Sequence, residues 1–282
     1  MQEFGEIFAV QRLGAYLQFT VVAPGVAAGF QPGQFVAIAV GGPTSATLLR
    51  RSFALYGATS TTEFAGTVQF VVAVHGAGTQ WLAERQPGDR LDLIGPLGTP
   101  FGIPAQPVPA VLVGGGYGAA PLIPLAHRLI GIGCPVQIVL GASTAARLFG
   151  EMVAKRTVGS VTVTTDDGSA GRRGLVTEPL PDVIQRIGAQ VVYACGPMPM
   201  LQAVGDVARL HGIPAQVAVE EAMACGIGVC MTCVLPVRGE DGYSRMVRSC
   251  VEGPVFLADR VRWSDVGLLP DDLVGADGMK GH

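Results

Sequence analysis

The sequence has few charged side chains and no marked excess of either sign. Asp, Glu, Lys and Arg make up 15% of its 282 residues and leave a formal net charge of -3, whereas about 25% charged residues is usual. This balance gives no electrostatic basis for binding nucleic acid or an anionic membrane. The apolar share of 49% and the length instead allow a large core and two compact domains.

Signals for export and membrane insertion are also lacking. The start, MQEFGEIFAVQRLG, has early acidic residues and no continuous apolar run. Residues 107–126 carry no charge over the length of a membrane helix, but they contain four prolines and four glycines, so we expect no membrane span. We therefore expect a cytoplasmic protein. In that reducing compartment, six cysteines indicate metal or redox chemistry rather than disulfides.

The N-terminal third is predicted to form an antiparallel β-barrel. Short β-branched and aromatic runs, separated by Gly, Pro and Thr, lie at residues 4–13, 16–23, 34–40, 50–58 and 66–76. Five or six strands at such close spacing are typical of a small barrel. A proline-rich stretch without periodicity, residues 96–109, then predicts a domain junction.

After this junction, buried strands alternate with helical segments, which is typical of a doubly wound parallel sheet. Residues 110–113, 135–143, 160–167 and 189–197 are the expected strands. We divide the chain into a barrel domain, residues 1–103, an α/β nucleotide-binding domain, residues 104–214, and a small C-terminal segment, residues 215–282.

Two glycine-containing turns end strands of the predicted sheet. GGGYG follows the strand at 110–113, and Cys195-Gly196-Pro197 ends the strand at 189–197. Both turns should lie at the carboxyl edge of the sheet, where α/β folds bind ligands, and a helix N-terminus there stabilises a pyrophosphate. A tight turn without a ligand is the alternative for the glycines alone. The candidate nucleotide contacts are Gly114, Gly115, Gly116, Gly118, Cys195, Gly196 and Pro197.

Four cysteines near the end of the chain form a C-x4-C-x2-C-x16-C array. Structural zinc usually requires two C-x2-C pairs, and only one is present here. The spacing is that of plant-type [2Fe–2S] ligands, and Gly226 and Gly228 would let the loop wrap around a cluster. A [2Fe–2S] cluster is therefore the prediction, and zinc the alternative. The candidate metal ligands are Cys225, Cys230, Cys233 and Cys250.

The barrel contains a candidate anchor for a flavin diphosphate. Two arginines in RRSFALYG precede a strand, and a guanidinium offers forked donors to phosphate. A solvated pair at a strand edge is the alternative. Gly78 and Thr79 begin a short predicted helix whose backbone N–H groups could meet a second phosphate. No histidine has the partner spacing needed for metal binding or nucleophilic catalysis.

These segments together resemble a known family. RSFAL, HGAGT, LVGGGYGAAPL, TDDGSAGRRGLVT, YACGPMPML and EEAMACGIGVCMTCV with RSCVEGPVF occur in the same order as in the electron-transfer subunits of bacterial dihydroorotate dehydrogenase, within the ferredoxin–NADP reductase superfamily. The resemblance spans residues 5–265. It implies FAD bound between the barrel and the nucleotide domain, and NAD at the sheet.

By this resemblance, the flavin motif Arg-x-x-Ser falls on Arg51, Ser52, Phe53 and Ala54. Ala54 replaces the usual serine, which removes one possible hydrogen bond to FAD. The family's other flavin contacts fall on Val71, Val72, Ala73, Gly78 and Thr79, and its cluster ligands on the four cysteines of the array.

The resemblance also implies a reaction. A partner subunit that holds FMN oxidises dihydroorotate, and electrons pass through [2Fe–2S] and FAD to NAD+ in pyrimidine biosynthesis. The expected complex is a heterotetramer with two copies of each subunit. Two alternatives remain: an NAD(P)H-dependent reductase that serves a ferredoxin, hydrogenase or oxygenase, and a zinc-containing binding module without enzymatic activity.

The choice between NAD and NADP depends on basic residues near the end of the second strand of the sheet, because a 2′-phosphate needs them. Only Arg147 follows that strand closely. We therefore predict NAD; a preference for NADP would point to Arg147 or Arg172.

Overall fold

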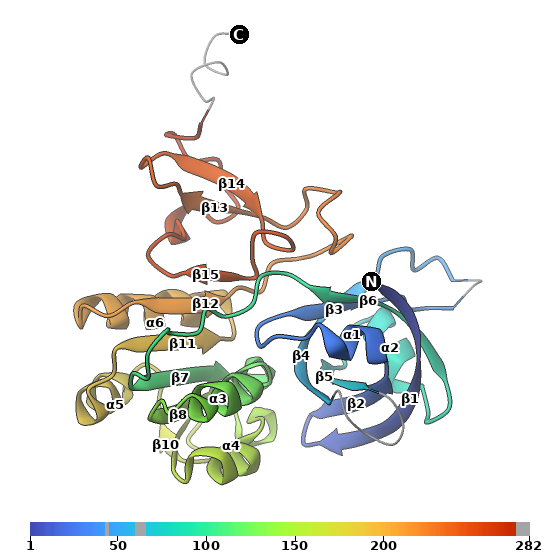
Figure 1. Ribbon diagram of the computed structural model, residues 1–282, viewed down its shortest axis with the longest axis horizontal. Helices are drawn as coiled ribbons and strands as arrows, with labels where there is room; N and C mark the ends of the chain where they lie inside the picture. The colour runs from blue at the N-terminus through green and yellow to red at the C-terminus, as the bar shows by residue number, and fades with distance from the viewer. Residues whose placement is uncertain (43–44, 60–65, 275–282) are drawn as a thin grey trace.

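The computed structural model describes residues 1–42, 45–59 and 66–274. No helix in these residues is long and apolar enough to cross a membrane. The chain folds into a barrel, an adjoining α/β sheet and a C-terminal segment that lies against both (Figure 1). The fold class predicted from the sequence is confirmed.

The barrel is closed by six antiparallel strands in the order β1-β2-β5-β4-β3-β6. Its core holds stacked phenylalanines and aliphatic side chains, and two short helices, α1 (Pro24–Ala28) and α2 (Ala77–Ala83), cover its ends. The strands are β1 (Gln2–Leu13), β2 (Tyr16–Val22), β3 (Phe35–Ile38), β4 (Arg51–Thr59), β5 (Thr67–Ala73) and β6 (Arg90–Leu97).

The second sheet has the order β10-β9-β8-β7-β11-β12-β15, and all its pairs except β12–β15 are parallel. The strands are β7 (Ala110–Gly115), β8 (Val136–Ala142), β9 (Val161–Thr165), β10 (Arg172–Arg173), β11 (Val191–Cys195), β12 (Ala215–Ala218) and β15 (Val255–Leu257). Chain order reverses between β7 and β11, so a ligand site is expected at the carboxyl ends of these two strands.

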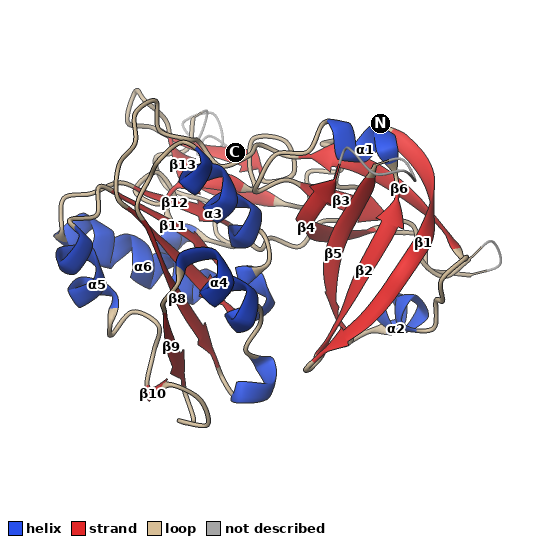
Figure 2. Cartoon of the chain, turned by 60° about the horizontal axis from the view of Figure 1, so that its bottom comes forward, coloured by secondary structure: helices blue, strands red, loops and turns tan. Residues whose placement is uncertain are grey.

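Four helices cover the two faces of this sheet (Figure 2). Apolar residues of α3 (Leu122–Gly131) and α4 (Glu151–Val158) pack on one face, and those of α5 (Leu180–Ile187) and α6 (Met198–Leu210) on the other. The central strand β7 is almost fully buried because both of its faces are covered.

The C-terminal segment carries the hairpin β13 (Val234–Arg238) and β14 (Ser244–Arg248) above the edge of the sheet (Figure 1). Strands β12 and β15 belong to the sheet although they lie within residues 215–282, so this segment contributes both a cap and two sheet strands. The coil from Gly98 to Pro109 joins barrel and sheet, where the proline-rich junction was predicted.

Candidate functional site: three adjoining sites

A cavity of about 490 Å³ opens between the barrel and the sheet. The barrel contributes the predicted flavin residues Ser52, Phe53, Ala54, Val71 and Ala73, and the sheet edge contributes Gly118 and Cys195. Val72 is fully buried in the barrel core and does not line this cavity.

Strands β4 and β5 part where they border this cavity. They pair from Leu55–Phe70 to Thr59–Thr67, whereas residues Arg51 to Ala54 pair with β3 instead. Beyond Phe70, at residues 71–73, the edge of β5 that faces β4 is therefore no longer paired with it. This edge borders the cavity. Its backbone groups are suited to a flat, polar-edged ring such as a flavin.

Arg51 and Gly78, which are 27 positions apart in the sequence, are brought together beside the barrel. A Cβ atom on Gly78 would lie 3.0 Å from Arg51 Nε, so a side chain larger than hydrogen would crowd the guanidinium. Thr79 is buried, and its hydroxyl accepts the N–H groups of His75 and Gly76 at 3.0 Å. The Thr79 hydroxyl thus shapes the turn before α2.

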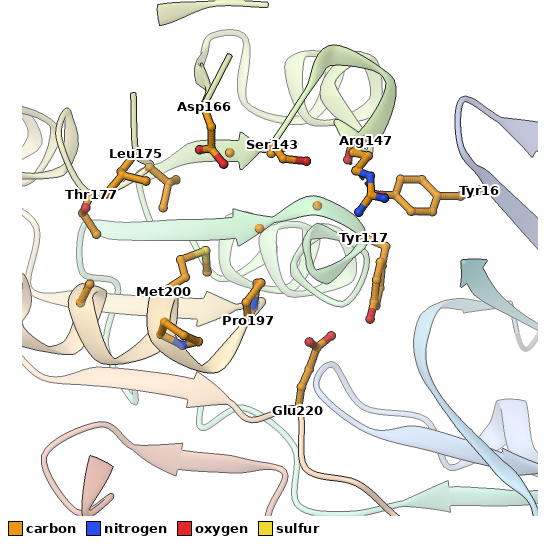
Figure 3. A pocket seen from close by; sticks show the side chains of 17 residues that line it. Tyr16, Tyr117, Ser143, Arg147, Asp166, Leu175, Thr177, Pro197, Met200 and Glu220 are labelled. Atoms are coloured by element: carbon orange, nitrogen blue, oxygen red, sulfur yellow. Dashed lines mark hydrogen bonds between the residues drawn. The ribbon is translucent and has the colours of Figure 1, made fainter. Parts of the chain in front are cut away.

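A second cavity, also about 490 Å³, lies over the carboxyl ends of β7, β8 and β11 (Figure 3). Of the predicted nucleotide residues, Gly115, Gly116 and Pro197 line it, while Gly114 is buried below the loop. Its charged lining residues are Arg147, Asp166 and Glu220.

The two loops at the switch point are packed directly against each other. A Cβ atom on Gly118 would lie 2.7 Å from the carbonyl oxygen of Cys195 and from the Cα atom of Gly196. Gly196 has a φ of 156°, in the range that L side chains rarely adopt. Glycine is therefore required for this close approach of β7 and β11.

Tyr117 and Glu220 line both cavities, and their side chains face each other (Figure 3). Water reaches Glu220 through the open cavities, yet the protein atoms around it displace enough solvent to raise the pKa of its carboxyl. Burial raises the pKa of the Cys195 thiol, and so does the nearby Glu220. The Glu220 carboxyl and the Cys195 thiol, at the boundary between the two cavities, are therefore both shifted toward their neutral forms.

The four cysteines of the array lie in two neighbouring pairs. Cys225 and Cys230 are in the outer loop, whereas Cys233 and Cys250 are buried. In the described part of the chain, no three Cys, His, Asp or Glu side chains are arranged to hold a metal ion. The donor chemistry nevertheless fits a cluster with four thiolate ligands.

The backbone of the cysteine loop donates hydrogen bonds to sulfur. The N–H groups of Ile227 and Val229 point at Cys225 Sγ, at 3.5 and 3.3 Å. Gly226 and Gly228 adopt left-handed conformations, as does Met231 with a φ of 57°. The guanidinium of Arg248 donates to the Gly228 carbonyl oxygen at 2.8 Å and holds the loop to the end of the hairpin.

The cysteine segment contacts the flavin cavity through the barrel. Phe35 packs against Cys233 and Cys250 and also lines the cavity. A Cβ atom on Gly226 would lie 3.4 Å from Ser52 Oγ, so the loop rests on the start of β4. The cysteines and the flavin cavity are therefore separated by little more than one side chain.

Several lining residues were not identified from the sequence. Phe35, Tyr117, Asp166 and Glu220 come from four separate segments, and their proximity depends on the tertiary fold. One local signal was available for Tyr117, because it lies within the glycine loop that was itself predicted to contact the nucleotide. Arg172, one of the two alternative phosphate ligands, pairs with Glu178 and does not line the cavity.

Comparisons with known proteins match this arrangement. Residues 9–101 match the oxidoreductase FAD-binding domain, and residues 220–262 match the iron–sulfur cluster binding domain of dihydroorotate dehydrogenase B. The dihydroorotate dehydrogenase B (NAD(+)) electron transfer subunit of Geobacillus thermodenitrificans is 41% identical over 82% of this chain and 86% of that protein. The subunit of the same name from Desulforamulus reducens is 33% identical over 88% of this chain and 92% of its own length.

The chain belongs to this family of electron transfer subunits. The family resemblance and the FAD and iron–sulfur cofactors predicted from the sequence are thereby confirmed, and the zinc alternative for the cysteines is disfavoured. A solved structure of an NADH-dependent reduced ferredoxin–NADP oxidoreductase is also similar, with a TM-score of 0.80, 31% identity and coverage of 94% of this chain and 91% of that one. The family architecture is thus shared with a reductase that has another electron partner.

Proposed function

We propose that this chain passes electrons from an FMN-containing dihydroorotate dehydrogenase subunit to NAD+, in a complex of two copies of each subunit. When bound, the iron–sulfur cluster supplies single-electron transfer, and FAD couples this to the two-electron reduction of NAD+. The protein's own residues set the distances and orientations of these groups.

The continuity of the three sites supports this function most strongly. Phe35 belongs both to the packing around Cys233 and Cys250 and to the flavin cavity. Tyr117 and Glu220 belong both to the flavin cavity and to the nucleotide cavity. The order cluster, flavin, nucleotide is the order in which a one-electron donor would be connected to NAD+.

The residues predicted from the sequence can be assigned to FAD, NAD and the cluster according to where they lie in the fold. Arg51 and Gly78 would hold the diphosphate of FAD, and residues 52–54 and 71–73 would border its ring. Gly115 and Gly116 would hold the diphosphate of NAD, and the turn at Cys195 to Pro197 its nicotinamide half, because they lie at the switch point of the sheet. The four cysteines would bind the cluster as thiolates.

The outer face of the cysteine loop is the proposed docking face for the FMN subunit. Its apolar side chains are exposed, from 43% for Val251 to 77% for Val229, with Ile227 and Met231 between them. Such a patch is unusual on a free monomer. Covering it with the partner would bring the partner's cofactor close to the cluster.

Reconstitution tests this function. The chain purified without air should oxidise NADH with an artificial dye but should not oxidise dihydroorotate. Adding the FMN subunit should produce NAD+ reduction that depends on dihydroorotate. Oxidation of dihydroorotate by the chain alone, or its failure to bind the FMN subunit, would contradict the proposal.

One observation favours a second candidate, a reductase that serves a different electron partner. The ferredoxin–NADP oxidoreductase structure matches over almost the whole chain, so the three-site arrangement does not by itself select the donor. If reduced ferredoxin, but not the FMN subunit, supports NAD+ reduction, this second function would replace the first.

A further inference from the structure

The side chain of Arg248 links two segments that carry cysteines of the array. Arg248 is the last residue of β14, and Cys250 lies in the turn that follows this strand. One guanidinium nitrogen of Arg248 donates to the Gly228 carbonyl oxygen at 2.8 Å. Because Gly228 lies between Cys225 and Cys230 in the outer loop, this bond connects the outer cysteine pair to the turn that holds Cys250.

Glu252 holds Arg248 from the other side of this turn. Its carboxylate accepts from the Arg248 guanidinium and from the Arg248 backbone N–H, both at 3.0 Å. The backbone N–H of Glu252 in turn donates to the Arg248 carbonyl oxygen at 2.9 Å. These bonds close the turn around Cys250. The guanidinium is fixed because one of its nitrogens is bound to Glu252 and the other to Gly228.

The outer loop and this turn are also packed closely against each other. Gly228 has a φ of 83°, and a Cβ atom on it would lie 2.5 Å from Val251 Cγ2. The backbone N–H of Ser249 donates to the carbonyl oxygen of Cys233 at 2.8 Å, which ties a third cysteine to the same turn. The Arg248 side chain therefore lies where the segments that carry all four cysteines meet.

Arg248 and Glu252 bring opposite charges to an otherwise uncharged loop. Residues 222–237, which hold three of the cysteines, contain no charged side chain. Glu252 raises the pKa of the Arg248 guanidinium most, and charges on Cys250 and Cys233 raise it further, so both cysteines lie within reach of the Arg248 charge. Reduction adds one negative charge to a cluster held by these thiolates, and a nearby positive charge favours this step whereas a negative charge opposes it.

We propose that Arg248 and Glu252 set the reduction potential of the iron–sulfur cluster. The charge of Arg248 stabilises the reduced form and that of Glu252 destabilises it, while the bond from Arg248 to Gly228 positions the outer cysteine pair. The inference rests on the electron path of the proposed function: one electron enters from the partner's cofactor and one leaves to FAD, so the charge of the cluster changes by one unit each way. The balance of the two side chains would thus decide how readily the cluster accepts that electron.

A redox titration without air tests the proposal, with dithionite as reductant and the electron paramagnetic resonance signal of the reduced cluster as readout. At the potential where half of the parent's cluster is reduced, the ratio of reduced to oxidised cluster should fall about threefold in Arg248→Gln. It should rise about threefold in Glu252→Gln, which keeps the bond to Gly228. Arg248→Lys retains the charge and should stay closer to the parent. Added salt should shrink both shifts.

Arg245→Gln is the matched control, because Arg245 lies on the same strand toward the tip of the hairpin and pairs with Asp241 at 2.7 Å. It should leave the potential unchanged. Loss of iron from Arg248→Gln would support its positioning role, and Glu252→Gln would then test the effect of charge. Shifts of the same sign in Arg248→Gln and Glu252→Gln, or no shift in Glu252→Gln, would overturn the inference. Absence of a cluster signal from the reduced parent would instead contradict the proposed function.

Discussion

Arg50 and Arg51 are adjacent in the sequence but have different tasks. Arg50 donates to the Asp92 carboxylate and to the carbonyl oxygens of Ala37 and Asp92, so it holds the barrel strands together. Arg51 donates to backbone oxygens of its own loop and lies next to Gly78. Alternation along a strand could not separate the two, because it does not reveal which side chain is already paired; only the family resemblance pointed to Arg51.

Replacing Arg51 should therefore weaken flavin binding rather than folding. We expect Arg51→Ala to raise the Kd for FAD about tenfold or more, because the diphosphate loses a charge-assisted, forked partner. Flavin per chain after desalting measures this. Arg51→Lys should have an intermediate effect, and equal retention of FAD in Arg51→Ala and the parent would show that another group binds the phosphate.

Glu220 should make stability depend on pH. Its folded pKa is raised above the ordinary value of 4.5, so the folded state binds more protons than the unfolded state between these two values. Stability is therefore fully present below pH 4.5 and falls as pH rises through the folded pKa. Glu220→Gln has no carboxyl at this position and so does not lose stability in this way. The Tm of this variant relative to that of the parent should therefore rise between pH 4.5 and 8.

This rise in the Tm of Glu220→Gln relative to the parent should be below about 3 °C, because water reaches Glu220 and screens its charge. Thermal melts of the flavin-loaded protein at several pH values provide the measurement. A constant difference in Tm across this range would mean that the pKa of Glu220 is not raised by folding.

At the scale of elements, the contact between the β7 and β11 loops is the feature most sensitive to side-chain size. Gly118→Ala would place a methyl group 2.7 Å from backbone atoms of Cys195 and Gly196, and backbone cannot move aside as a flexible side chain can. We expect a loss of about 1–3 kcal/mol in unfolding free energy and a higher KM for NADH. Denaturant unfolding and dye-coupled kinetics measure the two effects.

Gly131→Ala is the matched control for this variant. A Cβ atom there meets no other atom within 4 Å, and Gly131 ends α3. Alanine at this position should be neutral or slightly stabilising. If both alanine variants behaved alike, the direct packing of the two loops would not be what requires glycine at position 118.

Elements with strong local patterns could be predicted from the sequence. Glycine and proline punctuation located five barrel strands, and the strand-turn-helix pattern placed GGGYG and Cys195-Gly196-Pro197 at one sheet edge. Strand β6 was not identified individually, because RLDLIGPL contains charged residues and a proline. Strand β15 has only three residues, and its pairing with β12 depends on the tertiary fold.

At the scale of the whole molecule, the three sites adjoin in the order cysteine loop, flavin cavity and nucleotide cavity. Met231 is 53% exposed there and has a left-handed backbone, a conformation that aspartate tolerates better than most residues. Met231→Asp should raise the Kd for the FMN subunit at least about tenfold, because it places a charge in an apolar interface. Calorimetry or analytical ultracentrifugation measures binding.

Leu210→Asp is the control for this surface. Leu210 is 79% exposed at the end of α6, away from the cysteine loop, so its replacement should leave the complex intact. NADH-to-dye activity should be unchanged in both variants. Normal assembly of Met231→Asp with the FMN subunit would place the docking face elsewhere.

The most direct test of the central claim is the effect of Cys230→Ser on two activities of the assembled complex. Cys230 is exposed in the outer loop, and its loss should remove the cluster without touching the flavin cavity, as iron and FAD contents would verify. The account predicts that NADH-to-dye activity persists while dihydroorotate-dependent NAD+ reduction is lost. If a complex without the cluster still reduced NAD+ with dihydroorotate at the parent rate, the cluster would not connect the partner to the flavin.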